Sequence, residues 1–157
     1  MEPDLGMGGR DYNNALTIFF ISYAGFEPIT NILIKKWSPR VFFTAIILAW
    51  GIIMTLMGVV HNKAGLLACR WFLGIAEAGL FPGVNYYLSC WYRRQELGLR
   101  AALFFSAAAL AGSFGGLLAA AITEMNGIGG YAGWRWIFII EGLMTVGVGI
   151  VCWWMTF

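Results

Sequence analysis

Long apolar runs separated by short charged segments dominate the chain. Five such runs fall between the charged clusters, at residues 12–34, 41–60, 65–91, 101–122 and 134–157. A helix needs about 20 predominantly apolar residues to cross the ~30 Å hydrocarbon core of a bilayer. Each run reaches that length. The pattern therefore predicts five transmembrane helices joined by short connectors, with a polar, extracytoplasmic N-terminal tail over residues 1–11.

The apolar runs do not show the alternation that membrane strands require. A transmembrane β-barrel is built from segments of about ten residues in which apolar and polar side chains alternate. The second run instead reads Val41-Phe-Phe-Thr-Ala-Ile-Ile-Leu-Ala-Trp50. The predicted fold class is therefore an all-α integral membrane protein.

Composition agrees with this class and excludes others. Of the 157 residues, 60% are hydrophobic and 11% are charged, whereas a soluble domain is about 25% charged. The same balance excludes a disordered chain. A net charge of +2 without a basic patch argues against nucleic acid as a partner. Cys69, Cys90 and Cys152 are odd in number and far apart, so no disulfide framework, metal site or cofactor is predicted.

Basic residues gather in alternate connectors. The first and third connectors hold six of them: Lys35, Lys36, Arg40, Arg93, Arg94 and Arg100. Connectors rich in lysine and arginine stay on the cytoplasmic side. We therefore expect the N-terminus outside and the C-terminus inside.

Prolines and small residues suggest how the helices meet. Pro28 and Pro82 are expected to interrupt the first and third runs, and the carbonyls that they free must find partners or line a cavity. Gly74 in the third run, and Gly112 and Gly116 in the fourth, stand among small residues at helical spacing. Such residues let a second helix approach closely in lipid, so these glycines predict helix-packing faces.

Charged side chains inside membrane helices are costly and by default mark functional sites. Arg70 and Glu77 lie seven residues apart in the third run, which places them on one helix face about 10.5 Å apart. Gly74 lies between them and is expected to leave a groove. A guanidinium binds carboxylates bidentately, and a carboxylate in a low-dielectric cavity binds a proton more readily. The pair could couple the movement of an anion to protons, or could be a buried ion pair that only fixes packing.

Two further acidic residues and one amide are candidates for a cavity or a polar network. Glu27 stands beside Pro28 and near Asn31, where it could cap a helix break or bond to another helix. Glu141 lies in the outer half of the last run, and an Arg70–Glu141 pair is allowed by depth. The sequence does not choose among these roles.

The remaining polar residues have simpler interpretations. Arg135 is expected to reach the interface within an aromatic belt, and His61 to be a solvated loop residue. The chain carries no phosphate-binding loop, no His-Glu-x-x-His and no Ser/His/Asp set within the membrane. No enzymatic activity is predicted.

The segment Arg70-Trp-Phe-Leu-Gly-Ile-Ala-Glu77-Ala-Gly-Leu-Phe-Pro-Gly83 resembles the fourth helix of the anion:cation symporters of the major facilitator superfamily. Other stretches resemble the fungal allantoate permease branch, which includes nicotinate, pantothenate and biotin-type carriers; they are residues 12–23, 85–92, 105–116 and 136–142. The resemblance implies that Arg70 binds the anionic substrate and that Glu77 takes part in proton coupling. It implies no firm role for Glu27 or Glu141.

The resemblance also has departures. Glu27 is directly followed by Pro28, where the branch has an apolar residue between them, and the connector at residues 35–40 lacks the acidic residue of the superfamily's loop signature.

The five runs would correspond to the second through sixth helices of a carrier's N-terminal half. The first helix and the C-terminal half are then expected to be missing partners, because such carriers rock two halves about a central site. The leading prediction is a fragment of a proton-coupled symporter for a small organic anion such as allantoate or nicotinate, in the plasma membrane. The alternative is a truncated, non-transporting membrane fragment that acts at most as an interaction partner.

Overall fold

The computed structural model describes residues 8–155, which form α-helices and one short 3-10 helix and contain no β-strand. The elements are α1 (Gly9–Lys36), α2 (Pro39–Val59), α3 (Lys63–Glu77), α4 (Leu80–Trp91), α5 (Arg94–Thr123), η1 (Ile128–Gly130) and α6 (Gly133–Met155). Helices α3 and α4 follow one another along a single span, so the described residues hold five helices long and apolar enough to cross a membrane. The predicted all-α class and the five spans are confirmed.

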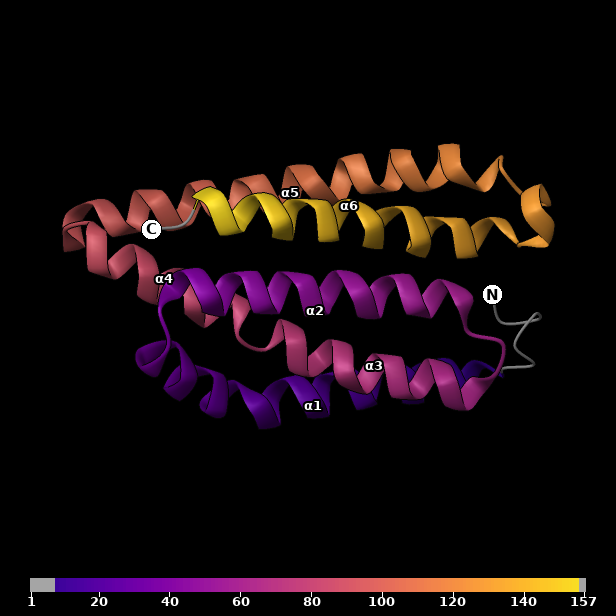
Figure 1. Ribbon diagram of the computed structural model, residues 1–157, viewed down its shortest axis with the longest axis horizontal. Helices are drawn as coiled ribbons and strands as arrows, with labels where there is room; N and C mark the ends of the chain where they lie inside the picture. Colours follow the sequence, from indigo (N-terminus) through magenta and orange to yellow (C-terminus); the bar gives the residue numbers. More distant parts are fainter. Residues whose placement is uncertain (1–7, 156–157) are drawn as a thin grey trace.

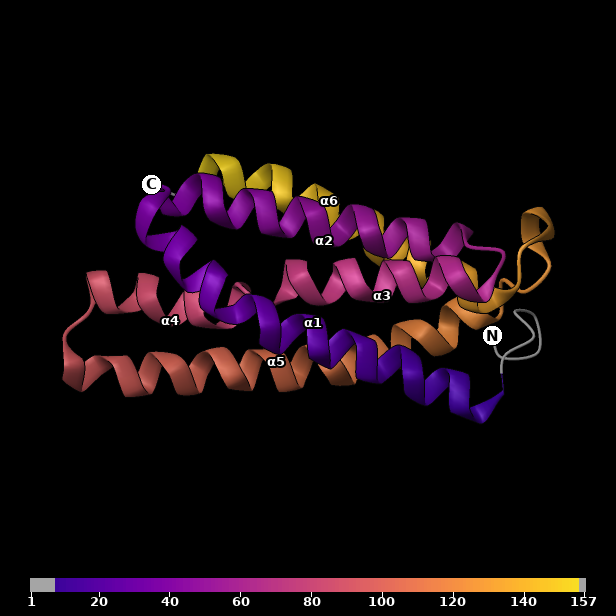
Figure 2. The same cartoon turned by 90° about the horizontal axis from the view of Figure 1, so that it is seen from below.

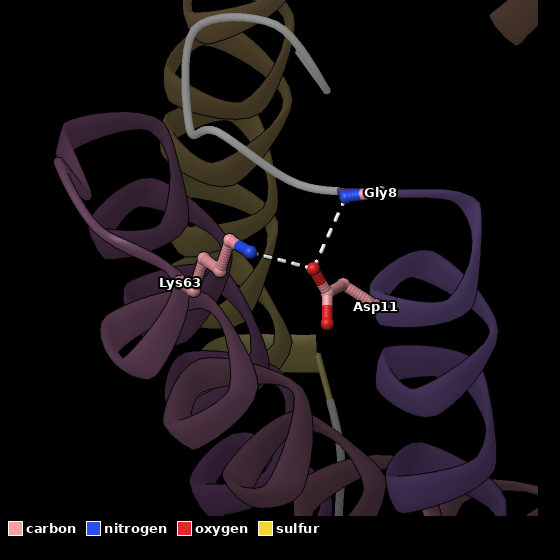
Figure 3. Close-up of polar contacts among 3 residues, drawn as sticks. All are labelled: Gly8, Asp11 and Lys63. Atoms are coloured by element: carbon pink, nitrogen blue, oxygen red, sulfur yellow. Dashed lines mark hydrogen bonds and ion pairs between the residues drawn. The ribbon is translucent and has the colours of Figure 1, made fainter.

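The helices extend beyond the apolar runs at their charged ends. α5 starts at Arg94, seven residues before the run that begins at Ala101. α1 starts at Gly9, where Asp11 accepts hydrogen bonds from the Gly8 N–H at 3.1 Å and from the Lys63 ammonium at 2.6 Å (Figure 3). The last part of the predicted tail is therefore helical, and residues 1–7 of it lie outside the described residues. Hydropathy identifies the segment of a helix that lies in the hydrocarbon core, whereas hydrogen bonds to the first backbone N–H groups determine where the helix begins.

Successive spans run in opposite directions along the long axis. The α1–α2 and α4–α5 connectors lie at one end, together with the end of α6, and the α2–α3 and α5–α6 connectors lie at the other (Figures 1 and 2). The two basic clusters therefore share one end, as the sequence predicts. Its assignment to the cytoplasm stays a prediction.

Residues at the opposite end contact one another across connectors. The Arg135 guanidinium lies 5.2 Å from the Trp134 ring centroid and 5.5 Å from that of Tyr131. This is the aromatic setting expected for Arg135. One of its nitrogens is 3.4 Å from Nε2 of His61. His61 is exposed, as expected, but it also has this partner from α6.

Helix α2 lies in the middle of the bundle, with α6 on one side and α1 and α3 on the other (Figure 1). The α2–α6 contact depends on glycines. A Cβ at Gly51 would lie 2.8 Å from the Val146 backbone nitrogen, and a Cβ at Gly142 would meet the Thr55 hydroxyl. The two backbones can approach this closely only because neither position carries a side chain. Sequence analysis did not single out these glycines.

Two small apolar clusters hold the third span in place. Met57, Leu66 and Leu73 join α2 to α3. A second cluster of Ile34, Phe42 and Phe43 joins α1 to α2 and packs against residues of α4, including Tyr87. The junction between α3 and α4 thus lies between two regions that are each fixed to α2.

Helix α5 does not make the close contact that was predicted for it. Nothing lies within 4 Å of a Cβ built at Gly112 or at Gly116, and Ile122 is the residue of α5 that is buried within the described chain. The prediction of a packing face at these two glycines is not met inside the part of the chain that the structure describes. Spacing of small residues shows that a helix can be approached closely, but not which helix does so.

The α2–α6 contact can be tested by adding volume on α6. We expect Gly142→Leu to lower the free energy of unfolding by about 1–3 kcal/mol, because the new side chain overlaps α2. The Cβ of residue 142 alone would lie 2.6 Å from the Thr55 backbone nitrogen. The control is Gly147→Leu on the same helix, where nothing lies within 4 Å. Thermal unfolding of the chain in detergent measures both, and equal midpoints for the two variants would contradict the packing.

Candidate functional site

Arg70 and Glu77 both lie on α3 and both are half-buried. Two helical turns separate them, which puts them on the same face about 10.5 Å apart along the axis. The ion pair found among the described residues joins Lys63 to Asp11, at the end of the molecule. Neither Arg70 nor Glu77 has an oppositely charged group of residues 8–155 within 4.0 Å. The described chain therefore leaves both charges without the partner that a purely structural ion pair would provide.

The groove expected at Gly74 is filled by α1. A Cβ at Gly74 would contact the Ser22 hydroxyl and would lie 2.6 Å from the carbonyl oxygen of Phe19 and 3.2 Å from the Tyr23 nitrogen. The missing side chain leaves room for a backbone and not for a ligand. Gly74 thus sets how closely α1 lies beside Arg70 and Glu77.

This contact brings Tyr23 toward Glu77. Tyr23 lies within electrostatic range of both Glu27 and Glu77, and Arg70 lies within range of Glu77. Tyr23 and Glu27 are one helical turn apart on α1, so the side of α1 next to α3 contributes a phenol and a carboxylate. Sequence analysis did not select Tyr23. Its spacing of four residues from Glu27 is the signal that could have found it.

The third span breaks immediately after Glu77. Helix α3 ends at Glu77 and α4 starts at Leu80, with Ala78 and Gly79 in a turn between them. Pro82 has no N–H to donate to the carbonyl four residues earlier, which belongs to Ala78. The Thr30 hydroxyl of α1 donates to the Glu27 carbonyl at 2.8 Å and lies 3.4 Å from the Ala78 oxygen in a buried contact, so the two carbonyls share its one proton. The expected partner for a carbonyl freed at Pro82 is therefore found.

Gly79 allows the break to pack tightly. A Cβ there would lie 2.7 Å from Ile46, 2.9 Å from Phe42 and 3.1 Å from Thr30. The turn is thus enclosed by α1 and α2. Because it is enclosed, the end of α3, where Glu77 lies, is held in one place.

Pro28 does not break its helix, contrary to expectation. α1 is continuous from Gly9 to Lys36 with Pro28 in its interior. Membrane helices tolerate proline where neighbouring groups compensate for the lost hydrogen bond. Asn31, which was proposed to share a network with Glu27, is half-buried on α1, and its side chain makes no hydrogen bond to another described residue.

Glu141 lies elsewhere in the bundle. It lines a groove of about 550 Å³ between α2, α4, α5 and α6, together with Trp50, Leu80 and Gly115 among other mainly apolar residues. The Arg70–Glu141 pair that depth allows is not formed. Glu27 and Glu141 therefore belong to different parts of the described structure. No group of three or more His, Cys, Asp or Glu side chains that could hold a metal ion comes together within residues 8–155.

Comparison with known proteins agrees with this architecture. A family model described as Major Facilitator Superfamily matches residues 1–157. An MFS-type transporter, cnsO, of Penicillium expansum is 44% identical over 95% of this chain and 29% of its own length. An uncharacterized transporter of Schizosaccharomyces pombe is 44% identical over 97% of the chain and 30% of its own. A putative tartrate transporter of Agrobacterium vitis is 36% identical over 96% of this chain and 35% of its own length. The chain spans about a third of the length of these curated relatives.

The hydroxyl at the helix break can be tested by an isosteric change. We expect Thr30→Val to lower the free energy of unfolding by about 1 kcal/mol or more, because the buried Ala78 carbonyl loses its donor. Thr30→Ser should keep most of the stability. Thermal unfolding in detergent measures the effect.

Thr17→Val serves as the matched control. The Thr17 hydroxyl is exposed and donates only to the Asn13 carbonyl of its own helix. If Thr30→Val and Thr17→Val unfold at the same temperature, the Thr30 hydroxyl does not support the break.

Proposed function

The chain belongs to the major facilitator superfamily, and on that premise we propose that it supplies the anion-binding and proton-binding helix of a carrier that moves a small organic anion together with protons. The observation that carries the proposal is the unpaired placement of Arg70 and Glu77 on one face of α3. A charge buried in a membrane protein without a partner is expensive unless it binds something. On this view the protein is a transporter and not an enzyme.

Arg70 is proposed to bind the anion. A guanidinium stays charged at any physiological pH and matches a carboxylate with two parallel hydrogen bonds. Arg70 lies in the interior of α3, a full turn or more from either end of that helix, and is half-buried. A carboxylate entering the membrane from water would find there a guanidinium that can replace its hydration and that stays charged when poorly hydrated.

Glu77 is proposed to carry the proton. It is the last residue of α3, at a break that Thr30, Gly79 and Pro82 hold in place. A carboxylate that alternates between charged and neutral forms needs a fixed position and neighbours that can accept either form. Tyr23 is suited to this because its hydroxyl can donate to the carboxylate or accept from the carboxylic acid. The proposal adds Tyr23 and Glu27 of α1 as neighbours of the proton site.

The substrate class follows from the charge of Arg70 and from one relative. The Agrobacterium vitis protein is named as a putative tartrate transporter, and tartrate is a dicarboxylate. This supports a small carboxylate as substrate, with allantoate or nicotinate as the specific candidates and the plasma membrane as the site. Alternating access needs a second helical half facing this one, so the proposed activity is that of the assembled carrier.

The anion role predicts the effect of replacing Arg70 in a complete carrier. We expect Arg70→Gln to reduce uptake of the radiolabelled anion by about 10- to 100-fold, since a charge-assisted hydrogen bond contributes about 1.5–3 kcal/mol. Arg70→Lys should restore only part of it. Arg100→Gln is the control, because Arg100 stacks on Tyr92 at the end of the bundle. Normal uptake by Arg70→Gln, at equal surface expression, would refute the anion site.

The proton role predicts a different loss. We expect Glu77→Gln to abolish accumulation driven by an imposed pH gradient, while exchange of labelled for unlabelled anion across the membrane persists. The physical reason is that a permanently neutral side chain cannot exchange a proton but leaves Arg70 able to bind. Accumulation that still follows the pH gradient in Glu77→Gln would assign proton coupling to another group.

A further inference from the structure

A groove of about 400 Å³ runs along the contact of α2 and α6 at the end of the bundle that carries the basic clusters. Its lining residues are Val41, Thr44, Ala45, Leu48, Ile150, Trp153 and Trp154. Helices α2 and α6 lie side by side there in both views (Figures 1 and 2). Four of the lining side chains are exposed: Val41, Ile150, Trp153 and Trp154. Both helices are long and apolar enough to cross a membrane.

Arg40 stands at the head of this groove with part of its hydrogen-bonding capacity unused. Its guanidinium carbon lies 4.5 Å from the centre of the Trp153 ring, so the planar group stacks on the wall of the groove. Its Nε atom is buried and has no hydrogen-bond partner among residues 8–155. A buried charged donor without an acceptor is strongly unfavourable. An acceptor from outside the chain would remove that cost.

Thr44 presents a second unused donor one helical turn deeper. Thr44 lines the groove and is 7% exposed, and its hydroxyl oxygen is buried without a hydrogen-bond partner in the described chain. Every other serine or threonine within the described helices donates to a carbonyl three or four residues earlier in its own helix. The Thr44 hydroxyl does not make this local hydrogen bond. Its hydroxyl is free for a ligand in the groove.

The order of these groups along α2 matches the order of groups in a phospholipid. Arg40 is the second residue of α2 and Thr44 lies about 6 Å further along the axis. A phosphate at the membrane surface would lie beside Arg40, the glycerol ester carbonyl beside Thr44, and an acyl chain along the apolar part that ends at Leu48. Trp153 and Trp154 are the aromatic residues that favour the interface at this depth.

We propose that this groove, the Arg40–Thr44 groove, binds one anionic phospholipid. Anionic lipid is favoured over zwitterionic lipid because the helix ends and connectors at this end carry Lys35, Lys36, Arg93 and Arg94. Each lysine or arginine close to the surface adds about 1 kcal/mol of attraction to anionic lipid. The site lies along the contact of α2 and α6 and is separate from the Arg70 and Glu77 face of α3.

The test is lipid retention by the purified chain. The delipidated protein is titrated with phosphatidylglycerol or with phosphatidylcholine of the same acyl chains, and native mass spectrometry counts bound lipids. We expect one phosphatidylglycerol to bind before any other, and Arg40→Gln to weaken that binding about fivefold. Arg100→Gln, which removes a stacked arginine at the same end, should leave it unchanged. Equal losses in the two variants would mean diffuse attraction and would overturn the site.

Two further arms separate the parts of the proposal. Thr44→Val should weaken the binding of both lipids about two- to fivefold, because both carry the ester carbonyl, and Thr44→Ser should restore that binding. If Thr44→Val has no effect on binding, the assigned pose is wrong. Glycerol 3-phosphate at millimolar concentration should not displace the lipid. Displacement would show that the groove recognises a phosphate alone and would overturn lipid as its occupant. Thermal unfolding without lipid checks that each variant is folded.

Discussion

The packing of α1 against the break in the third span is the contact on which the surroundings of Glu77 depend. Inside a bilayer no water can satisfy a backbone oxygen, so the Ala78 carbonyl that Pro82 leaves unpaired needs a donor from the protein. Thr30 of α1 stands in the position to supply it. This contact requires α1 to lie against the break, and Gly74 and Gly79 allow it to do so. The location of Glu77, as the last residue of α3, depends on the same set of contacts.

Glycine is used in this bundle to choose helix partners. Gly74 brings α1 to α3, and Gly51 and Gly142 bring α2 to α6. Without a hydrophobic driving force between helices in lipid, close van der Waals contact selects one neighbour over another. The paired helices therefore hold Arg70 beside α1, and they place the two donors of Arg40 and Thr44 at the edge of the α2–α6 contact. Gly112 and Gly116 of α5 would allow a similar close approach, but no helix of the described chain makes it.

The charged residues fall into three settings that have different physical meanings. Lys63 and Asp11 are exposed and paired at a helix end, where their contribution to stability is small. Arg135 stacks on aromatic rings at the interface. Arg70, Glu77 and Arg40 lack an acidic or basic partner among residues 8–155. Charges of the third kind are where a membrane protein meets ligands, protons or lipid, and both proposals rest on them.

The sequence by itself determined the fold class, the number of spans and their alternating direction. These depend on bilayer thickness and on the placement of lysine and arginine, which are properties of local composition. The segment around Arg70 and Glu77 also indicated the superfamily, which the family comparison confirmed, whereas the allantoate branch remains a proposal. Sequence also predicted that Pro82 interrupts its span, but the same reasoning was wrong for Pro28.

The tertiary structure decided which residues meet. The positions of proline and glycine in the sequence show where a helix can lose a backbone hydrogen bond or be approached closely. The neighbouring helix decides whether that hydrogen bond is replaced and whether the glycine face is covered. Tyr23 and Thr30 acquire their roles through α1 lying on α3, and Glu141 is separated from Arg70 by the packing of α6 on α2. A Cβ at Gly112 would have no described atom within 4 Å. Contacts between distant segments depend on three-dimensional packing, which a one-dimensional pattern does not contain.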